Sequence, residues 1–245
     1  MQDDGFFDAE VAATYDAVHG APSDASIPQV VARLHELAAG GAALEFAIGT
    51  GRIALPLQTA GTKVAGIELS QAMVAELRKK EIGAPMDIAI GDMTTTQVAG
   101  NFALVFLVFN TIDNLTTQDA QIACFQNAFD HLQPGGCFVV ETLVPPIQKL
   151  PAGQTLLAND CTDAHWGIDE FDVVTQTYTS HHIRPIDGQD RRLSIPFRYC
   201  WPAEMDVMAK MAGFVPEVRW ADWDMSPFTR DSTSHVSVWR KSGGH

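Results

Sequence analysis

The stretch LEFAIGTGR, residues 44–52, decides the fold of this chain together with Glu68. An apolar run followed by closely spaced glycines and a helix start predicts a strand, a tight turn and a helix N-terminus. Glycine lets the backbone approach a ligand closely, and the helix start offers unpaired N–H donors. A carboxylate at the end of the next apolar run suits the two hydroxyls of a ribose. The pattern therefore predicts a site for a nucleotide-type cofactor.

Outward from this stretch, the chain alternates between helical and strand-like runs, which indicates βαβ units around one core. The length of 245 residues allows one large α/β domain, with or without a small appended subdomain. Residues 102–109 are so uniformly apolar that we expect a central strand, buried on both faces. The expected strands are 42–47, 63–69, 86–90, 102–109 and 137–143, and the expected helices are 30–39, 53–59, 70–80 and 120–132.

The pattern changes after Val144. Prolines break the βα alternation, and residues 153–167 have no clear period, so we expect a loop or lid there. Residues 173–184 and 191–201 look like two strands of a hairpin around Asp187–Gly188. That turn would place Ile186 opposite Gln189, His182 opposite Leu193 and Tyr178 opposite Phe197. One face of the hairpin would then carry an aromatic wall: Tyr178, His182, Phe197, Tyr199 and Trp201.

The last part of the chain returns to α/β character. A helix is expected at 202–212, with Gly213 as its end, followed by strands at 215–220 and 235–239. We expect these two strands to add an antiparallel pair to the sheet.

Charge and composition exclude several classes of protein. The net charge of −14 repels phosphate backbones and anionic lipid, so neither nucleic acid nor a membrane surface is an expected partner. The longest apolar run is too short to span a bilayer and the first residues do not form a signal peptide, which favours a cytoplasmic protein. The four cysteines have no zinc-binding or redox spacing, and no metal is expected.

Several ordered motifs resemble the class I methyltransferases that use S-adenosylmethionine (SAM). The resemblance covers nearly the whole chain and rests on Tyr15–Asp16, LEFAIGTGR, GIELS at 66–70, GDM at 91–93, HLQPGG at 131–136 and MAGF at 211–214. It implies an α/β, Rossmann-like sheet of seven mostly parallel strands, with the last strand antiparallel and helices on both faces. YDAVHG at 15–20 and the inserted hairpin are most similar to small-molecule methyltransferases of secondary metabolism, including amino-sugar enzymes.

The resemblance also implies a division of the chain into four parts. We expect an N-terminal lid helix region at 1–27 and a SAM-binding core at 28–144. Residues 145–201 would form a lid and hairpin over the acceptor site, and residues 202–245 would complete the core sheet.

Cofactor contacts carry over from the resemblance residue by residue. Ala47 stands where the family motif has its first glycine, which adds a methyl group beside the turn. The implied contacts are Tyr15, Glu45, Ala47, Gly49, Thr50, Gly51, Arg52, Glu68, Leu69, Met73, Gly91, Asp92, Met93, Phe109 and Asn110.

Four of these contacts have specific expected roles. Glu45 would face the ammonium group of SAM, Glu68 would hold the ribose hydroxyls, and Asp92 would accept from the adenine amino group. Arg52 would meet the SAM carboxylate or an anionic substrate, or remain a solvated side chain. Met73 and Met93 would lie against the adenine ring, and Tyr15 would close over the methionine portion. Packing in the core is the alternative for these side chains.

The sequence indicates the residues that would bind the methyl acceptor less clearly. His182 and His181 are candidate general bases because imidazole titrates near neutrality, and pairing favours His182, which faces the aromatic wall. A structural or exposed role is the alternative for either histidine. No Asn/Asp-Pro-Pro signature follows Asn110, which disfavours DNA methylation. The candidate acceptor contacts are Asn114, Trp166, Tyr178, Arg198 and Trp201.

The leading hypothesis is a methyltransferase that moves a methyl group from SAM to an N or O atom of a small molecule by in-line displacement, leaving S-adenosylhomocysteine (SAH). Two alternatives stay open: a non-catalytic SAM-binding regulatory protein, and a nicotinamide-dependent oxidoreductase, which shares the glycine turn and the acid. A monomer or homodimer is expected.

Overall fold

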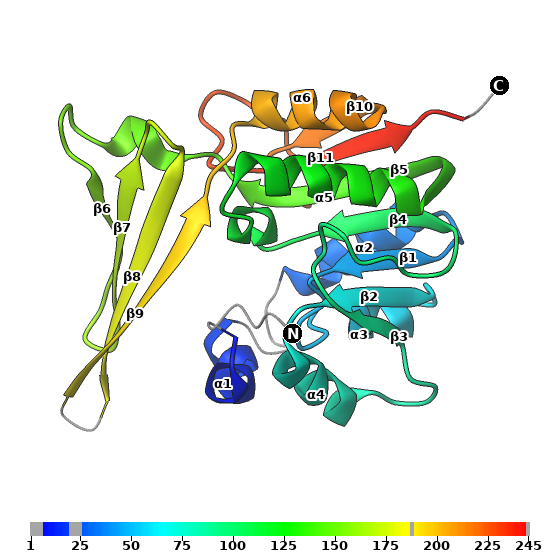
Figure 1. The fold of residues 1–245 in the computed structure, drawn as a ribbon, viewed down its shortest axis with the longest axis horizontal. Coiled ribbons are helices and arrows are strands. Elements are labelled where there is room, and N and C mark those ends of the chain that lie inside the picture. The colour runs from blue at the N-terminus through cyan, green and yellow to red at the C-terminus, as the bar shows by residue number, and fades with distance from the viewer. Residues whose placement is uncertain (1–6, 20–25, 187–188, 244–245) are drawn as a thin grey trace.

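A seven-stranded sheet forms the core of the protein. The computed structural model describes residues 7–19, 26–186 and 189–243. The strand order is β10-β11-β5-β4-β1-β2-β3, and the sheet runs through the right half of Figure 1. Its strands are β1 (Ala43–Phe46), β2 (Val64–Glu68), β3 (Asp87–Ile90), β4 (Phe102–Leu107), β5 (Leu132–Leu143), β10 (Phe214–Trp220) and β11 (Ser234–Lys241).

The sheet is parallel except for one strand. β1 pairs in parallel with β2 and β4, and the parallel ladder continues to β3 and β5. β11 runs antiparallel to both of its neighbours, β5 and β10. This confirms the expected sheet of seven strands with the last one reversed, and β4 occupies the expected central position.

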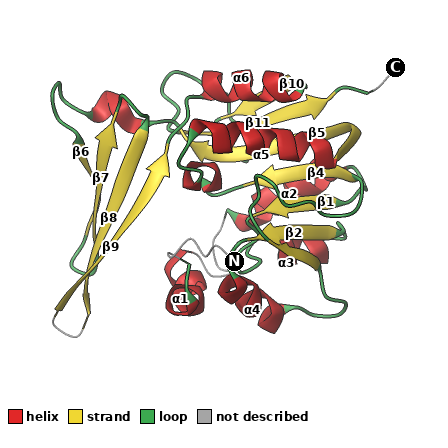
Figure 2. Ribbon diagram, viewed as in Figure 1, coloured by secondary structure: helices red, strands yellow, loops and turns green. Residues whose placement is uncertain are grey.

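Helices cover both faces of the core sheet (Figure 2). Side chains of α5 and α6 pack on one face, while α2, α3 and Leu77 of α4 pack on the other. β4 serves both layers because its side chains alternate: Val105 and Leu107 face α5, and Leu104 and Phe106 face α2 and α3. The helices are α1 (Ala9–His19), α2 (Ile27–Ala38), α3 (Ala54–Thr59), α4 (Gln71–Lys80), α5 (Gln118–His131) and α6 (Pro202–Ala212), with short 3-10 turns η1 (Thr111–Asn114) and η2 (Pro146–Lys149).

A second sheet of four antiparallel strands stands apart from the core, at the left of Figure 1. Its order is β6-β7-β8-β9. The pairing of β8 with β9 confirms the expected register, with Ile186 opposite Gln189, His182 opposite Leu193 and Tyr178 opposite Phe197. Asp187–Gly188, the expected turn, lies outside the described residues. The strands are β6 (Leu156–Cys161), β7 (Trp166–Asp172), β8 (Thr177–Ile186) and β9 (Gln189–Arg198).

The expectation of a loop at residues 153–167 is wrong. β6 and the start of β7 lie in this range, so the insertion is a four-stranded sheet rather than a hairpin alone. Residues 173–176 form the turn between β7 and β8 and not the start of a strand. Five of the six residues of β6 are exposed, so its sequence carries no apolar alternation to indicate a strand.

The N-terminal helix α1 lies beside α4, on the side of the core that faces the second sheet (Figure 1). Within the described residues, no helix combines the length and apolar character that crossing a membrane requires.

Candidate functional site

The glycine turn joins β1 to α3 at the carboxyl end of the sheet. Ala47, Gly49 and Gly51 all have positive φ, of 52°, 57° and 80°. A Cβ atom on Gly51 would lie 2.9 Å from Cγ of Leu77, so both backbone conformation and packing require glycine there. Ala47 adopts the same left-handed region with a side chain, which strains the turn. The turn holds the backbone close to whatever occupies the adjoining pocket.

Glu68 ties the turn to the next helix. Its carboxylate accepts the N–H of Gly49 at 2.8 Å through Oε2 and the N–H of Ser70 at 2.9 Å through Oε1. Ser70 caps α4, accepting the N–H of Met73. Glu68 thus fixes the glycine turn and the start of α4 relative to each other.

Glu45 supplies a buried acceptor with unused capacity. The side chain lines the pocket beside the turn and is 4% exposed. Its Oε2 has no hydrogen-bond partner among the described residues. Burial raises the pKa of Glu45 well above its ordinary value, against the opposing influence of Arg52. A buried carboxyl oxygen without a donor suits an ammonium group, so the residues present fit the cofactor that the sequence implies.

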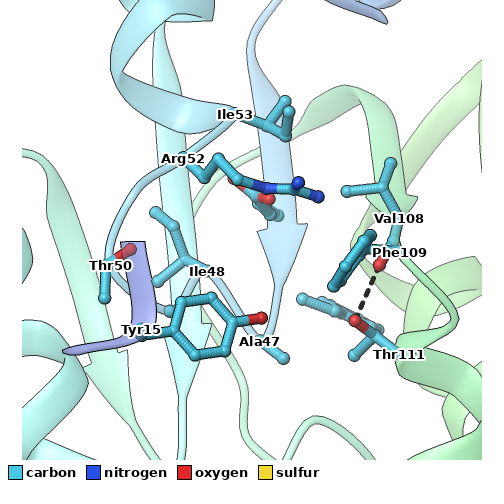
Figure 3. A pocket seen from close by; sticks show the side chains of 12 residues that line it. Tyr15, Ala47, Ile48, Thr50, Arg52, Ile53, Val108, Phe109 and Thr111 are labelled. Atoms are coloured by element: carbon cyan, nitrogen blue, oxygen red, sulfur yellow. Dashed lines mark hydrogen bonds between the residues drawn. The ribbon is translucent and has the colours of Figure 1, made fainter. Parts of the chain in front are cut away.

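Arg52 and Phe109 form the far wall of this pocket, with Tyr15 of α1 opposite (Figure 3). The Arg52 guanidinium lies 4.2 Å from the centre of the Phe109 ring, a cation–π contact. Thr111 donates from Oγ1 to the carbonyl oxygen of Val108 at 2.7 Å and fixes the chain after β4. The pocket lining comprises Tyr15, Glu45, Phe46, Ala47, Ile48, Gly49, Thr50, Arg52, Ile53, Val108, Phe109 and Thr111.

Asp16 holds α1 over the pocket through two side-chain hydrogen bonds. Its carboxylate accepts from Thr50 Oγ1 at 2.5 Å and from Lys80 Nζ at 2.5 Å. Partial burial raises the pKa of Asp16, but the hydrogen bonds from Lys80 and Thr50 outweigh it, and the net effect lowers the pKa. Because Thr50 belongs to the glycine turn itself, the lid helix and the cofactor turn are directly linked.

The residues expected at the adenine end lie after β2 and β3. Asp92 accepts from the N–H and Oγ1 of Thr94 at 2.8 and 2.7 Å, which orients its carboxylate. Gly91 donates its N–H to the carbonyl oxygen of Glu68 at 2.9 Å, so the two strand ends are held together. Met73 and Met93 are buried, and Leu69, which follows β2, is half-buried.

Asn110 joins the ends of β4 and β5. It has a positive φ of 59°, and its Oδ1 accepts the N–H of Leu143 at 2.8 Å. Phe109 donates its N–H to Glu141 Oε2 at 2.9 Å. Asn114, a candidate acceptor contact, donates its side-chain amide to the carbonyl oxygen of Thr111 within η1 at 3.2 Å.

The second sheet presents an aromatic face toward the core. We call the side of the sheet that carries Tyr178 and His182 the inner face. The Tyr178 ring stacks between Phe171, at 5.2 Å, and Phe197, at 5.0 Å. Its hydroxyl donates to Asp113 Oδ2 at 3.3 Å, which joins the inner face to η1 and so to the pocket residue Thr111.

The candidate base His181 and the candidate acceptor contact Trp166 do not lie on the inner face. His181 follows the alternation of β8 to the outer face, where its Nδ1 contacts Ser194 Oγ at 2.8 Å. Trp166 lies opposite Ile183 on that outer face and is 56% exposed. The structure therefore places Tyr178 and His182 on the inner face, four positions apart along β8, and His181 and Trp166 on the outer face.

Arg198 and Trp201 lie at the base of the second sheet. Arg198 is buried and donates to Glu204 at 2.7 Å and to the side chain of Gln121, so it links β9 to α5 and α6. Trp201 precedes α6 and contacts Tyr199 edge to face, with ring centres 6.4 Å apart.

Asp113 is a site residue that the sequence did not single out. It is 4% exposed, and burial raises its pKa to about 8, although Tyr178, Thr142 and Arg198 oppose the shift. Its Oδ1 and the nearby Thr142 Oγ1 both lack a partner of good hydrogen-bond geometry among the described residues. The available signal was its position, three residues after Asn110 at the carboxyl edge of the central strand. Among the residues with assigned positions, no cluster of three or more His, Cys, Asp or Glu side chains could hold a metal ion.

Comparison with known proteins agrees with this geometry. A family described as a methyltransferase domain matches residues 43–136. The methyltransferase CcbJ of Streptomyces caelestis is 33% identical, with a TM-score of 0.86 over 99% of this chain and 100% of that one. SAM-bound CalS10 of Micromonospora echinaspora, an amino pentose methyltransferase, shares the fold at 18% identity, with a TM-score of 0.71 over 94% and 97% of the two chains.

A curated relative matches over part of its length. The dTDP-3-amino-3,4,6-trideoxy-alpha-D-glucopyranose N,N-dimethyltransferase of Streptomyces venezuelae is 32% identical over 98 residues, which span 40% of each chain. The glycine turn, Glu68, the reversed β11 and these similarities together lead to one conclusion. The chain belongs to the class I methyltransferases that use SAM.

Proposed function

We propose that this protein methylates an amino nitrogen of a small, partly apolar acceptor, with a hydroxyl oxygen as the second candidate. The observation that carries the proposal is that η1 connects the cofactor pocket to the inner face of the second sheet. Thr111 lines the cofactor pocket, and Asp113, two residues further, contacts Tyr178 on the inner face. An acceptor that lies against the aromatic rings of the inner face would extend toward the pocket.

Residues around the glycine turn would hold SAM. In this proposal the buried Glu45 accepts from the ammonium group and Arg52 binds the carboxylate, which would draw its guanidinium from the Phe109 ring. Glu68 accepts from the ribose hydroxyls, and Asp92 accepts from the adenine amino group. Tyr15, on a lid helix fastened by Asp16, covers the methionine portion.

The bound sulfonium supplies an activated methyl group, so the protein mainly has to align the acceptor and exclude water. Tyr178 and Phe197, with Phe171 buried against Tyr178, offer a rigid surface for an apolar or sugar-like acceptor. An amine needs to be neutral before it attacks, and a hydroxyl normally needs a base. His182, on the same face, is the candidate base.

An amine is favoured because the curated relative and CalS10 are both named for amino-sugar substrates. We propose residues 145–201 as the part that covers the acceptor, after a lid at 1–27 and a core at 28–144, with 202–245 completing the sheet. We also propose that the protein acts in the cytoplasm as a monomer or homodimer, without nucleic acid. The net charge of −14 supports the last point because it repels phosphate backbones.

Calorimetric titration with SAM, SAH and NAD tests the cofactor. SAM and SAH are expected to bind and NAD is not. A second assay uses radiolabelled SAM with dTDP-3-amino-3,4,6-trideoxy-glucose as a probe acceptor, beside the matched 3-hydroxy sugar nucleotide. Label is expected in the amine, with the mass gain of one methyl group. SAM binding without transfer to any acceptor of a metabolite extract would instead favour a regulatory SAM-binding protein.

A further inference from the structure

Three side chains of the second sheet form a continuous chain of hydrogen bonds. Asp160 Oδ2, at the end of β6, lies 2.6 Å from Nδ1 of His165. Nε2 of His165 lies 2.9 Å from Nδ1 of His182 in β8. The two imidazole rings are nearly parallel, with an angle of 15° between their planes. Residues from three segments of the sheet thus meet in a line.

This line runs from the inner face to solvent. His182 is half-buried on the inner face, two strand positions from Ser180 and four from Tyr178. The side chain of His165 is 19% exposed and that of Asp160 is 43% exposed. One end of the chain therefore faces the proposed acceptor surface and the other end reaches water.

The hydrogen bonds determine which nitrogen of each ring carries a proton. A carboxylate only accepts, so Asp160 takes the Nδ1 proton of His165, and Nε2 of a neutral His165 must then accept. Nδ1 of His182 is consequently the donor, which leaves a lone pair on its Nε2. Ser180 Oγ lies 3.3 Å from that nitrogen, a long contact that an acceptor group could replace.

We propose that His165 and Asp160 are positioning residues that hold His182 as the general base and lead the acceptor's proton out to solvent. This inference rests on the proposed function, because it needs an acceptor nitrogen or oxygen that loses a proton. His182 alone touches the acceptor, and the other two act through it.

The proton transfer balances in two steps. As the acceptor atom bonds to the methyl carbon, the electrons of the carbon–sulfur bond return to sulfur and the acceptor's proton moves to His182 Nε2. The proton on His182 Nδ1 then passes to His165 Nε2, and the resulting imidazolium lies beside the Asp160 carboxylate. Positive charge is thus moved from the inner face to the solvent side. Loss of the His165 Nδ1 proton to water then leaves both rings protonated on Nε2, and exchange of the ring protons with water restores the Nδ1 tautomers before the next turnover.

The charged groups around His182 favour its neutral form. Burial lowers the pKa of His182, and the neighbouring His165, Arg184 and His181 lower it further, while Asp169 of β7 opposes them. The hydrogen bond from His165 lowers the pKa of Asp160, so that carboxyl stays ionised. His182 is therefore a neutral base at physiological pH, and the ionised Asp160 lies at the other end of the series of hydrogen bonds.

Nitrogen-15 NMR of the histidine rings, in the SAH complex of the full chain, tests the proton positions without any acceptor. His182 is expected as the tautomer protonated on Nδ1. Asp160→Asn should lower the pH at which the histidine pair takes up a proton, because it removes the charge that stabilises the imidazolium. Asp163→Asn, an exposed carboxylate in the same turn, is the matched control and should leave both properties unchanged. A His182 protonated on Nε2 in the neutral state would overturn the proposal.

Kinetics with the amino-sugar probe give the second test. Asp160→Asn should lower kcat roughly tenfold to a hundredfold with little change in KM, and should move the acidic limb of the pH profile to lower pH. His165→Gln can still accept from His182 Nδ1 but cannot pass a proton on, so the tautomer should persist while kcat falls. An unchanged acidic limb in Asp160→Asn would refute the relay. Failure of the wild-type protein to methylate any acceptor would instead refute the proposed function, whatever the NMR shows.

Discussion

The two sheets of the molecule are stabilised in different ways. Every residue of β1, β2 and β4 is buried, whereas Arg198 is the one buried residue of β9 and β6 has none. The core sheet is covered by helices on both faces, and the second sheet depends on one aromatic cluster and a few polar links to the core. Stability is thus concentrated in the region that holds the cofactor. Polar side chains are left available in the region proposed for the acceptor.

The largest expected effect tests this difference in stability. Phe138 of β5 is fully buried against the rings of Phe125, Phe214 and Trp239. Phe138→Ala should lower the free energy of unfolding by about 3–5 kcal/mol, through lost burial and the cavity that remains. Phe197→Ala, in the half-buried cluster of the second sheet, should lower it by about 1–2 kcal/mol. Urea denaturation measures both, and equal losses would contradict the comparison.

The next effect concerns cofactor binding by the core. Glu68→Ala should weaken SAM affinity about 100-fold, or about 2.7 kcal/mol, because the turn loses its acceptor and the ribose loses its partner. Calorimetric titration checks this change. Glu76→Ala, which alters a carboxylate on the outer side of α4 paired with Lys79, is the control and should bind SAM normally. Unchanged affinity in Glu68→Ala would refute the ribose role.

The free energy of unfolding should depend on pH through Asp113, which lies between the core and the second sheet. Burial raises the folded-state pKa of Asp113 from 3.8 to about 8, so the folded protein binds a proton that the unfolded chain releases above pH 4. This contribution to stability is complete below the unfolded pKa and is lost as pH rises toward about 8. Asp113→Asn removes this proton uptake, so its stability relative to wild type should rise by up to about 1.4 kcal/mol for each pH unit between the two pKa values. Urea denaturation at several pH values measures the difference, and a constant difference would contradict the assignment.

The smallest effect concerns strain within the core. Ala47 has a φ of 52°, which a glycine adopts without steric conflict. Ala47→Gly should therefore raise the free energy of unfolding by about 0.5–1 kcal/mol. Thermal denaturation measures the change. A loss of stability would show that the methyl group contributes packing that exceeds the strain.

The same contrast explains what the sequence could predict. Residues 102–109 and 42–47 were recognised as strands because burial on both faces demands uniformly apolar residues. The register of β8 and β9 followed from Asp187–Gly188 and from counting back along two strands. The sequence does not indicate β6 (Leu156–Cys161), because five of its six residues are exposed and they have no periodic apolar pattern. Strand formation there depends on pairing with β7, which no local signal reveals.

The site divides in a similar way. Glu45, Gly49, Gly51 and Glu68 lie around the turn that their motif predicted. His182 is predicted as a candidate base, but its hydrogen bond to His165 joins two strands and no local pattern indicates it. The contact of Asp113 with Tyr178 likewise joins segments far apart in the sequence. The alternation of β8 separates His181 from His182, a distinction that depended on knowing the strand register.

The reversed strand β11 has a consequence for how the protein is made. β5 pairs with β11 from Ser234 to Arg240, and Trp239 fills the core beside Phe125 and Phe138. Since β11 is synthesised after the second sheet, β5 has an open edge throughout synthesis of that sheet. Cooperative folding of the core must therefore wait for β11. A chain that stalls before β11 would leave the aromatic side chains around β5 exposed, where chaperones could bind them or other chains could aggregate with them.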